Sequence, residues 1–155
     1  MRLVIQRVKK ARVTVEGKVA GEVGKGLLVL LGVGREDQEE DAGALAGKLA
    51  ALRIMADEEG KMNRSIKDVG GEVLVVSQFT LYADTNRGRR PSFVKAASPK
   101  MAEDLYKRFV RELRGEGIKV ETGKFGHYME IEAVADGPVT IILDGLADKK
   151  TDPRP

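Results

Sequence analysis

Residues 73–84 read Val-Leu-Val-Val-Ser-Gln-Phe-Thr-Leu-Tyr-Ala-Asp, an apolar run that ends in hydroxyl, amide and aromatic groups. Residues 73–76 predict a buried strand, because a short continuous apolar run is typical of a strand that is covered on both faces. A second run of this kind, at 27–31, predicts another such strand. The polar and aromatic residues from 77 to 82 would then stand at a strand end, where binding residues commonly gather.

Strand patterns also occupy both ends of the chain. Val13 and Val15 alternate with polar neighbours, and Glu16-Gly17-Lys18 follows them as a typical hairpin turn. Towards the other end the sequence predicts closing strands at 119–121, 128–135 and 139–143.

Two helices are expected between these strands. Asp37 with Glu40 three residues later resembles a capping box, and the apolar spacing after it predicts a helix over 38–51. Ser98-Pro99 favours the start of a second helix, which Gly115 and Gly117 end. This order favours an α+β fold, with largely antiparallel or mixed β-sheets, barrel-like or two-layered, packed with two main helices.

Length and composition indicate one soluble domain. The chain has 155 residues, and we expect a single domain over 1–148 with a flexible tail at 149–155, which is charged and carries two prolines. The absence of cysteine excludes disulfides and thiolate nucleophiles. No signal-peptide pattern opens the chain, and no apolar stretch is long enough to span a membrane. We therefore expect a cytoplasmic protein.

Candidate catalytic groups are few. There is no Gly-x-Ser-x-Gly elbow, no Walker loop and no metal-ligand spacing, and His127 is the single histidine. The hydroxyls of Ser77 and Thr80 are weak nucleophiles without a base, and Asp84 lies four residues beyond Thr80. Capping of backbone groups at a strand end is the structural alternative for both hydroxyls. A catalytic site here would depend on fixed hydrogen-bond donors and would suit an activated substrate such as an ester.

Two further features allow more than one interpretation. Gly137-Pro138 is either an ordinary turn between strands or a rigid wall of exposed carbonyl oxygens, and the residues alone do not decide between them. Arg87, Arg89 and Arg90 gather in the loop after the hydroxyl-rich motif. They are candidates for RNA binding, although such a charge run is also typical of a solvated surface.

Taken together, several segments resemble the D-aminoacyl-tRNA deacylase family, also known as the D-tyrosyl-tRNA deacylase family. The resemblance runs from Met1 to about Asp144 and includes the opening segment 4–8. The segments that carry it are Ser77-Gln78-Phe79-Thr80-Leu81, Arg89-Arg90-Pro91-Ser92-Phe93, Val120-Glu121-Thr122-Gly123 with Phe125-Gly126, and Gly137-Pro138-Val139-Thr140.

The resemblance implies a hydrolase that cleaves the ester between a D-amino acid, or mischarged glycine, and the 3′-terminal adenosine of tRNA. It places catalysis at Ser77, Gln78, Phe79 and Thr80, without a metal or cofactor. Either Thr80 is the nucleophile, or the 2′-hydroxyl of the terminal ribose assists while backbone amides near Phe79 and Thr80 hold the oxyanion. The absence of a base beside Thr80 favours the second mechanism.

The resemblance also implies how L-amino acids are rejected. Gly137-Pro138 would be a cis pair that one subunit of a homodimer inserts into the pocket of the other, with Arg7 as its brace. Phe125 and Met129 would line the adenosine pocket. The sequence departs from the family pattern at Ala135, where asparagine is usual, and at His127, where a small residue is usual.

Two alternatives stay open from the sequence. One is an editing hydrolase of the same build that acts on another mischarged tRNA. The other is a non-catalytic RNA-binding protein, which the low aromatic content of 5% disfavours because such modules stack bases on aromatic rings.

Overall fold

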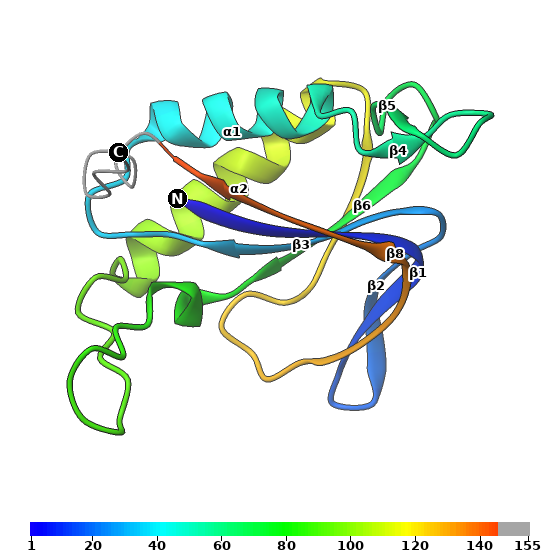
Figure 1. Ribbon diagram of the computed structural model, residues 1–155. Helices are drawn as coiled ribbons and strands as arrows, with labels where there is room; N and C mark the ends of the chain where they lie inside the picture. Colours follow the sequence, from blue (N-terminus) through cyan, green and yellow to red (C-terminus); the bar gives the residue numbers. More distant parts are fainter. Residues whose placement is uncertain (146–155) are drawn as a thin grey trace.

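The computed structural model describes residues 1–145, which form one α+β unit (Figure 1). A sheet has the strand order β2-β1-β3-β6-β7, and β8 pairs with β1 outside this path. The strands of this sheet are β1 (Arg2–Val15), β2 (Lys18–Val23), β3 (Gly26–Gly32), β6 (Glu72–Ser77), β7 (Lys119–Thr122) and β8 (Glu130–Asp144). The remaining elements are α1 (Glu39–Ala51), the short hairpin strands β4 (Met55–Ala56) and β5 (Met62–Arg64), the 3-10 helix η1 (Phe79–Tyr82) and α2 (Pro99–Gly115).

The sheet is mixed. β1 pairs antiparallel with β2, β3 and β8, whereas β6 pairs parallel with both β3 and β7. Both parallel strands need a crossover, and the chain supplies it through α1 before β6 and through α2 before β7. The predicted fold class is therefore confirmed.

The apolar runs at 27–31 and 73–76 are buried on both faces of the sheet. Leu27, Val29, Val73 and Val75 pack with residues of both helices in the larger core, and Figure 1 shows these helices together on one side of the sheet. The alternate residues Leu28, Leu74 and Val76 pack with valines of β1 and β2 in a second core. Alternation of side chains along a strand explains why an unbroken apolar run serves both cores.

The second core lies inside a strongly curled sheet. β2 approaches β7 so closely that a Cβ atom added to Gly21 would lie 2.4 Å from the Thr122 carbonyl oxygen. A glycine is required at this position because any side chain would meet backbone. The sheet is therefore barrel-like, as the sequence predicts.

The first helix begins as expected, but with different capping residues. The helix is α1, and its N-cap is Gln38, whose backbone N–H donates to Asp41 Oδ2 at 2.9 Å. The predicted capping box of Asp37 and Glu40 is wrong, because Asp37 is buried and pairs instead with the Met1 ammonium group and the Gly34 N–H. A buried carboxylate is stable only with such partners.

The C-terminal strands also differ from the prediction. The structure has one strand, β8, where the sequence predicts two at 128–135 and 139–143, and Gly137-Pro138 lies within it. The pairing of β8 with β1 shifts register between Gln6 and Val8, and this irregularity accommodates Gly137-Pro138 without ending the strand. No helix among the described residues is long and apolar enough to cross a membrane. The predicted tail at 149–155 and the domain boundary at 148 lie outside the described residues.

Candidate active site

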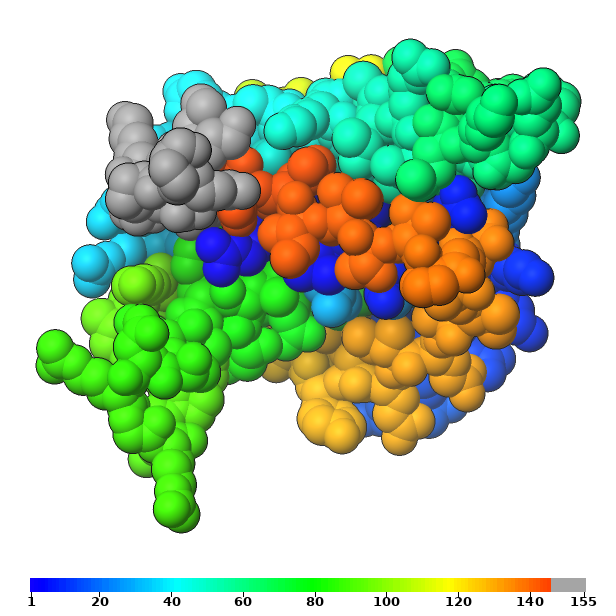
Figure 2. Space-filling view, in the orientation of Figure 1, coloured from blue at the N-terminus to red at the C-terminus, as the bar shows by residue number. Residues whose placement is uncertain are grey.

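A cleft of about 720 Å³ opens where β6 ends. One wall is formed by residues 77–79 and the following loop, and the other by residues 125–131. Figure 2 shows the hollow between these green and yellow-orange segments. The cleft is of the size that binds small ligands, and apolar side chains form most of its lining. The predicted site residues in its wall are Ser77, Gln78, Phe79, Phe125 and Met129.

The turn from β6 into η1 presents backbone donors. The Gln78 N–H donates to the Leu31 carbonyl at 2.8 Å, which fixes the start of the turn. Among residues 1–145, the N–H groups of Phe79 and Thr80 have no acceptor, as expected for the first turn of a helix. Two adjacent free N–H groups can together stabilise an oxyanion.

Thr80 lies just outside the lining of the cleft and is exposed. Its hydroxyl oxygen accepts a hydrogen bond from the Gln78 side-chain amide. An amide is not a base near neutral pH, so this contact does not activate the hydroxyl as a nucleophile.

Aromatic rings line the cleft on both sides. Phe79 is 55% exposed and meets Phe93 edge to face, with the ring centroids 5.0 Å apart. Across the cleft, Phe125 packs on Tyr106, whose hydroxyl donates to the Val75 carbonyl at 2.8 Å. Burial raises the pKa of Tyr106 to about 12. Tyr106 is therefore a neutral phenol that holds the wall in place.

The segment after β7 is shaped by small residues. A Cβ atom added to Gly123 would lie 2.5 Å from the Met129 sulfur, so glycine lets Met129 fold back into the cleft. His127 is exposed, and its Nδ1 lies 3.0 Å from the Phe125 carbonyl oxygen. The cleft therefore brings the Met129 side chain, backbone groups and four aromatic residues around one space that can hold a flat heterocycle.

A family model described as D-Tyr-tRNA(Tyr) deacylase matches residues 4–144. The chain belongs to the D-Tyr-tRNA(Tyr) deacylase family. It is therefore an enzyme of the hydrolase class, and both of these predictions from the sequence are confirmed.

Similar proteins agree with this chain in length, and similar solved structures agree with it in fold. A protein of Symbiobacterium thermophilum named D-aminoacyl-tRNA deacylase is 61% identical over 93% of this chain and 95% of its own. A solved structure titled "c-Myc DNA Unwinding Element Binding Protein" is 39% identical, with a TM-score of 0.86, and covers 93% of this chain and 98% of its own. A structure titled as a probable eukaryotic D-amino acid tRNA deacylase shares the fold at 19% identity, with a TM-score of 0.78 over 92% of this chain and 97% of its own.

The Gly-Pro pair of this family member lies away from its own cleft. The Gly137-Pro138 peptide bond is cis, and Gly137 has φ +152, where a Cβ atom would meet the Val139 nitrogen at 2.4 Å. Both residues are exposed, and neither lines the cleft. Arg7 donates from Nε to the Asp136 carbonyl at 3.0 Å and from Nη1 to the Ile54 carbonyl at 3.0 Å. Arg7 is therefore placed to hold the residue directly before the pair.

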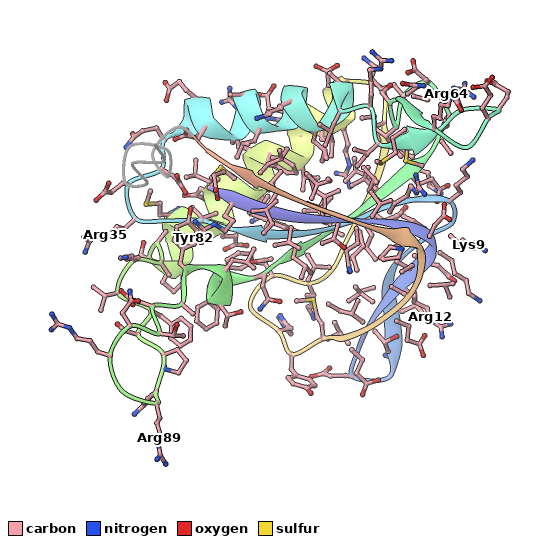
Figure 3. The ribbon with its side chains drawn as sticks, in the orientation of Figure 1. Lys9, Arg12, Arg35, Arg64, Tyr82 and Arg89 are labelled. Carbon is pink, nitrogen blue, oxygen red and sulfur yellow. The ribbon has the colours of Figure 1, made fainter. Side chains whose placement is uncertain are left out.

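The arginine loop of this deacylase also lies outside the cleft. A bridge between Asp84 and Ser92 closes the loop, and Arg87, Arg89 and Arg90 are exposed at its tip. Figure 3 shows Arg89 pointing away from the rest of the molecule. Its part in RNA binding stays a prediction.

Sequence reasoning missed some contributions to the site. It did not predict η1, whose free N–H groups follow from the helix end and not from side-chain type. Phe93 was expected only as part of the segment 89–93, although its ring packs on Phe79 in the cleft wall. An apolar residue in a polar loop was the available signal. Among residues 1–145, no three carboxylate or histidine side chains are grouped to hold a metal ion.

Proposed function

We propose that this chain hydrolyses the ester bond of D-aminoacyl-tRNA, and of glycine mischarged on tRNA, and releases the free amino acid and the tRNA. The observation that carries the proposal is the pair of free N–H groups at Phe79 and Thr80, beside an apolar cleft, in a member of this family. The 3′-terminal adenosine would lie against Phe125 and Met129. The ester carbonyl would then reach the two donors.

The chemistry follows from these donors. Water attacks the ester carbonyl, the N–H groups of Phe79 and Thr80 bind the oxyanion, and the ribose 3′-oxygen leaves as the acyl bond breaks. The proton that the attacking water loses passes to the departing 3′-oxygen, and the 2′-hydroxyl of the same ribose relays it. The hydrogen bond from Gln78 to the Thr80 hydroxyl supports this route over a threonine nucleophile, because no base within residues 1–145 contacts the hydroxyl. An aminoacyl ester is already activated, so positioned donors suffice.

Selectivity would come from a second copy of the chain. In the homodimer, the Gly137-Pro138 pair of one subunit enters the cleft of the other and puts carbonyl oxygens where an L side chain would lie. A D side chain points to solvent, and glycine has no side chain to exclude. Arg7, held at 11% exposure against Asp136, would keep these oxygens in position.

Exposed apolar side chains along β8 support this arrangement. β8 begins near the cleft, and Ile131 lines the cleft wall. Gly137 lies about 20 Å farther along the strand, at the usual rise per residue of a β-strand. Ile131, Val134 and Ile142 expose 40%, 43% and 62% of their surface on this strand. Because a twofold interface repeats each contact, apposed β8 strands would bring the Gly-Pro pair of each copy to the cleft of the other.

The test is to incubate the protein with D-tyrosyl-tRNA and L-tyrosyl-tRNA and to follow loss of the ester. We expect rapid loss of the D ester alone. Rapid loss of both would contradict the proposed filter, and loss of neither would contradict the deacylase activity and favour a binding protein.

A pair of variants tests the oxyanion site. Phe79→Pro removes both the ring and the N–H donor, whereas Phe79→Ala removes the ring and keeps the donor. We expect kcat to fall about 100-fold further in Phe79→Pro than in Phe79→Ala, the usual effect of losing one oxyanion donor. Equal kcat values in the two folded variants would contradict this role.

A further inference from the structure

A second cavity, of about 530 Å³, lies next to the cleft. It is formed by one face of α2 and by the segment after β7, and we call it the α2 groove. Phe125 and His127 line both the α2 groove and the cleft, so the two spaces meet at these residues. A polymeric ligand whose end lies in the cleft, and which leaves the cleft on this side, would enter the groove.

The α2 groove is strongly basic. Lys107, Arg111 and Arg114 line it from α2, and Lys124 lines it from the opposite segment. The single carboxylate in its lining is Glu103, which pairs with Lys107 at 2.8 Å. The groove therefore has an excess of positive charge, although the whole chain carries a net charge of only +3.

Three of these cations, Arg111, Arg114 and Lys124, are available to an outside anion. Arg111 and Lys124 are exposed, and within the described part of the chain neither has a carboxylate partner. Arg114 donates from Nη2 to the Val120 carbonyl at 2.8 Å, which anchors the guanidinium at the groove wall without neutralising its charge. A fixed arginine beside free cations favours binding of oxyanions.

The spacing of the cations indicates a polymer and not a single small anion. Lys107, Arg111 and Arg114 follow one another at helical spacing on one face, over about 10 Å of helix length. Cations spread along a groove neutralise successive phosphates of a nucleic-acid backbone, and an RNA stem is bound mainly through phosphates and 2′-hydroxyls.

We infer that the α2 groove binds the phosphate backbone of the acceptor end of tRNA as it leaves the cleft. This inference rests on the proposed function, because the cleft must hold the terminal adenosine for the next nucleotides to reach the groove. Phe125 then separates the adenosine subsite from the backbone path.

The test compares two substrates of different length in Arg111→Glu and Lys124→Glu. One substrate is an intact D-aminoacyl-tRNA, and the other is the D-aminoacyl ester of adenosine alone, which is too short to reach the groove. The matched control is Lys48→Glu, which makes the same charge change at an exposed lysine of α1 that lines neither cavity. Thermal unfolding verifies each variant, and Arg111→Gln serves if a glutamate variant fails to fold.

We expect KM for the intact tRNA to rise about tenfold in each groove variant, and the slope of log KM against log salt concentration to fall by about one per lost phosphate contact. The short ester should be cleaved with unchanged kcat/KM, and Lys48→Glu should resemble the wild type. Equal effects in Lys48→Glu, or unchanged KM and salt slope in the groove variants, would overturn the inference. If the wild type cleaves neither substrate, the proposed function itself fails.

Discussion

Replacement of Arg7 by alanine tests how the Gly-Pro pair is held. The guanidinium makes hydrogen bonds to the carbonyls of Asp136 and Ile54 and an ion pair with the Asp136 carboxylate at 3.3 Å. The Arg7 side chain is 11% exposed and that of Asp136 is 33% exposed. Arg7→Ala therefore leaves a half-buried carboxylate and two carbonyls without their donor.

The expected loss of folding stability in Arg7→Ala follows from these contacts. Breaking a fully buried ion pair costs about 3–5 kcal/mol, and the exposure of Asp136 lets water recover part of it, so we expect a loss of about 2–3 kcal/mol. For a chain of this length, that loss corresponds to a fall in Tm of about 5–10 °C at fixed protein concentration.

The assay combines thermal unfolding with selectivity. On the proposed mechanism, a loss of about 1.4 kcal/mol in the discrimination that the Gly-Pro pair exerts against L substrates lowers the D-to-L ratio of kcat/KM about tenfold. Arg12→Ala is the matched control, since Arg12 also lies on β1 and pairs with Glu132 of β8, but the two side chains are 44% and 64% exposed. An unchanged Tm and D-to-L ratio in Arg7→Ala, or the same losses in Arg12→Ala, would refute the reasoning.

Three further predictions concern catalysis, pH and packing. Thr80→Ala should keep measurable deacylation, and complete inactivity of the folded protein would point to a threonine nucleophile. Hydrogen bonds from Lys119 and the Gly24 N–H lower the pKa of Glu72 in the folded state below its ordinary value of 4.5. These hydrogen bonds therefore stabilise the fold fully above pH 4.5, and this stabilisation is lost as the pH falls through the lowered pKa. Urea titrations from pH 6 to pH 3 should show a shallower acid loss in Glu72→Gln than in the wild type, and parallel curves would contradict this. Gly47 faces open space on α1, so Gly47→Ala should stabilise the fold by about 0.5–1 kcal/mol. Gly26→Ala would place its Cβ atom against the Glu72 carbonyl and should destabilise the fold strongly. A Tm change of the same sign in both variants would contradict the packing described.

The sequence predicts the fold well where one physical pattern dominates. The apolar runs at 27–31 and 73–76 indicate doubly buried strands, and the structure uses their alternate residues in two cores. The helix after Ser98 begins at Pro99, where the N-terminal pattern places it. These features depend on neighbours in the chain, so local sequence is enough to predict them.

Features that depend on distant residues could not be predicted in the same way. Asp37 resembles a capping residue in the sequence, but β1 brings the Met1 ammonium group close, and this group forms an ion pair with the Asp37 carboxylate. Gly137-Pro138 looks like a turn, but pairing of β8 with β1 on both sides of it keeps one strand. The α2 groove likewise joins α2 to a segment after β7, and its charge is visible only when both are in place.

The central claim is that main-chain oxygens from a neighbouring subunit select the D configuration. Its most direct test is a crystal structure of the protein with a D-aminoacyl adenosine analogue whose ester is replaced by an amide. We expect a dimer in which the carbonyl oxygens of Gly137 and Pro138 from one copy lie within about 3.5 Å of the amino acid bound in the other, with its side chain directed to solvent. An analogue bound near Phe79 with no Gly-Pro pair beside it would contradict the claim.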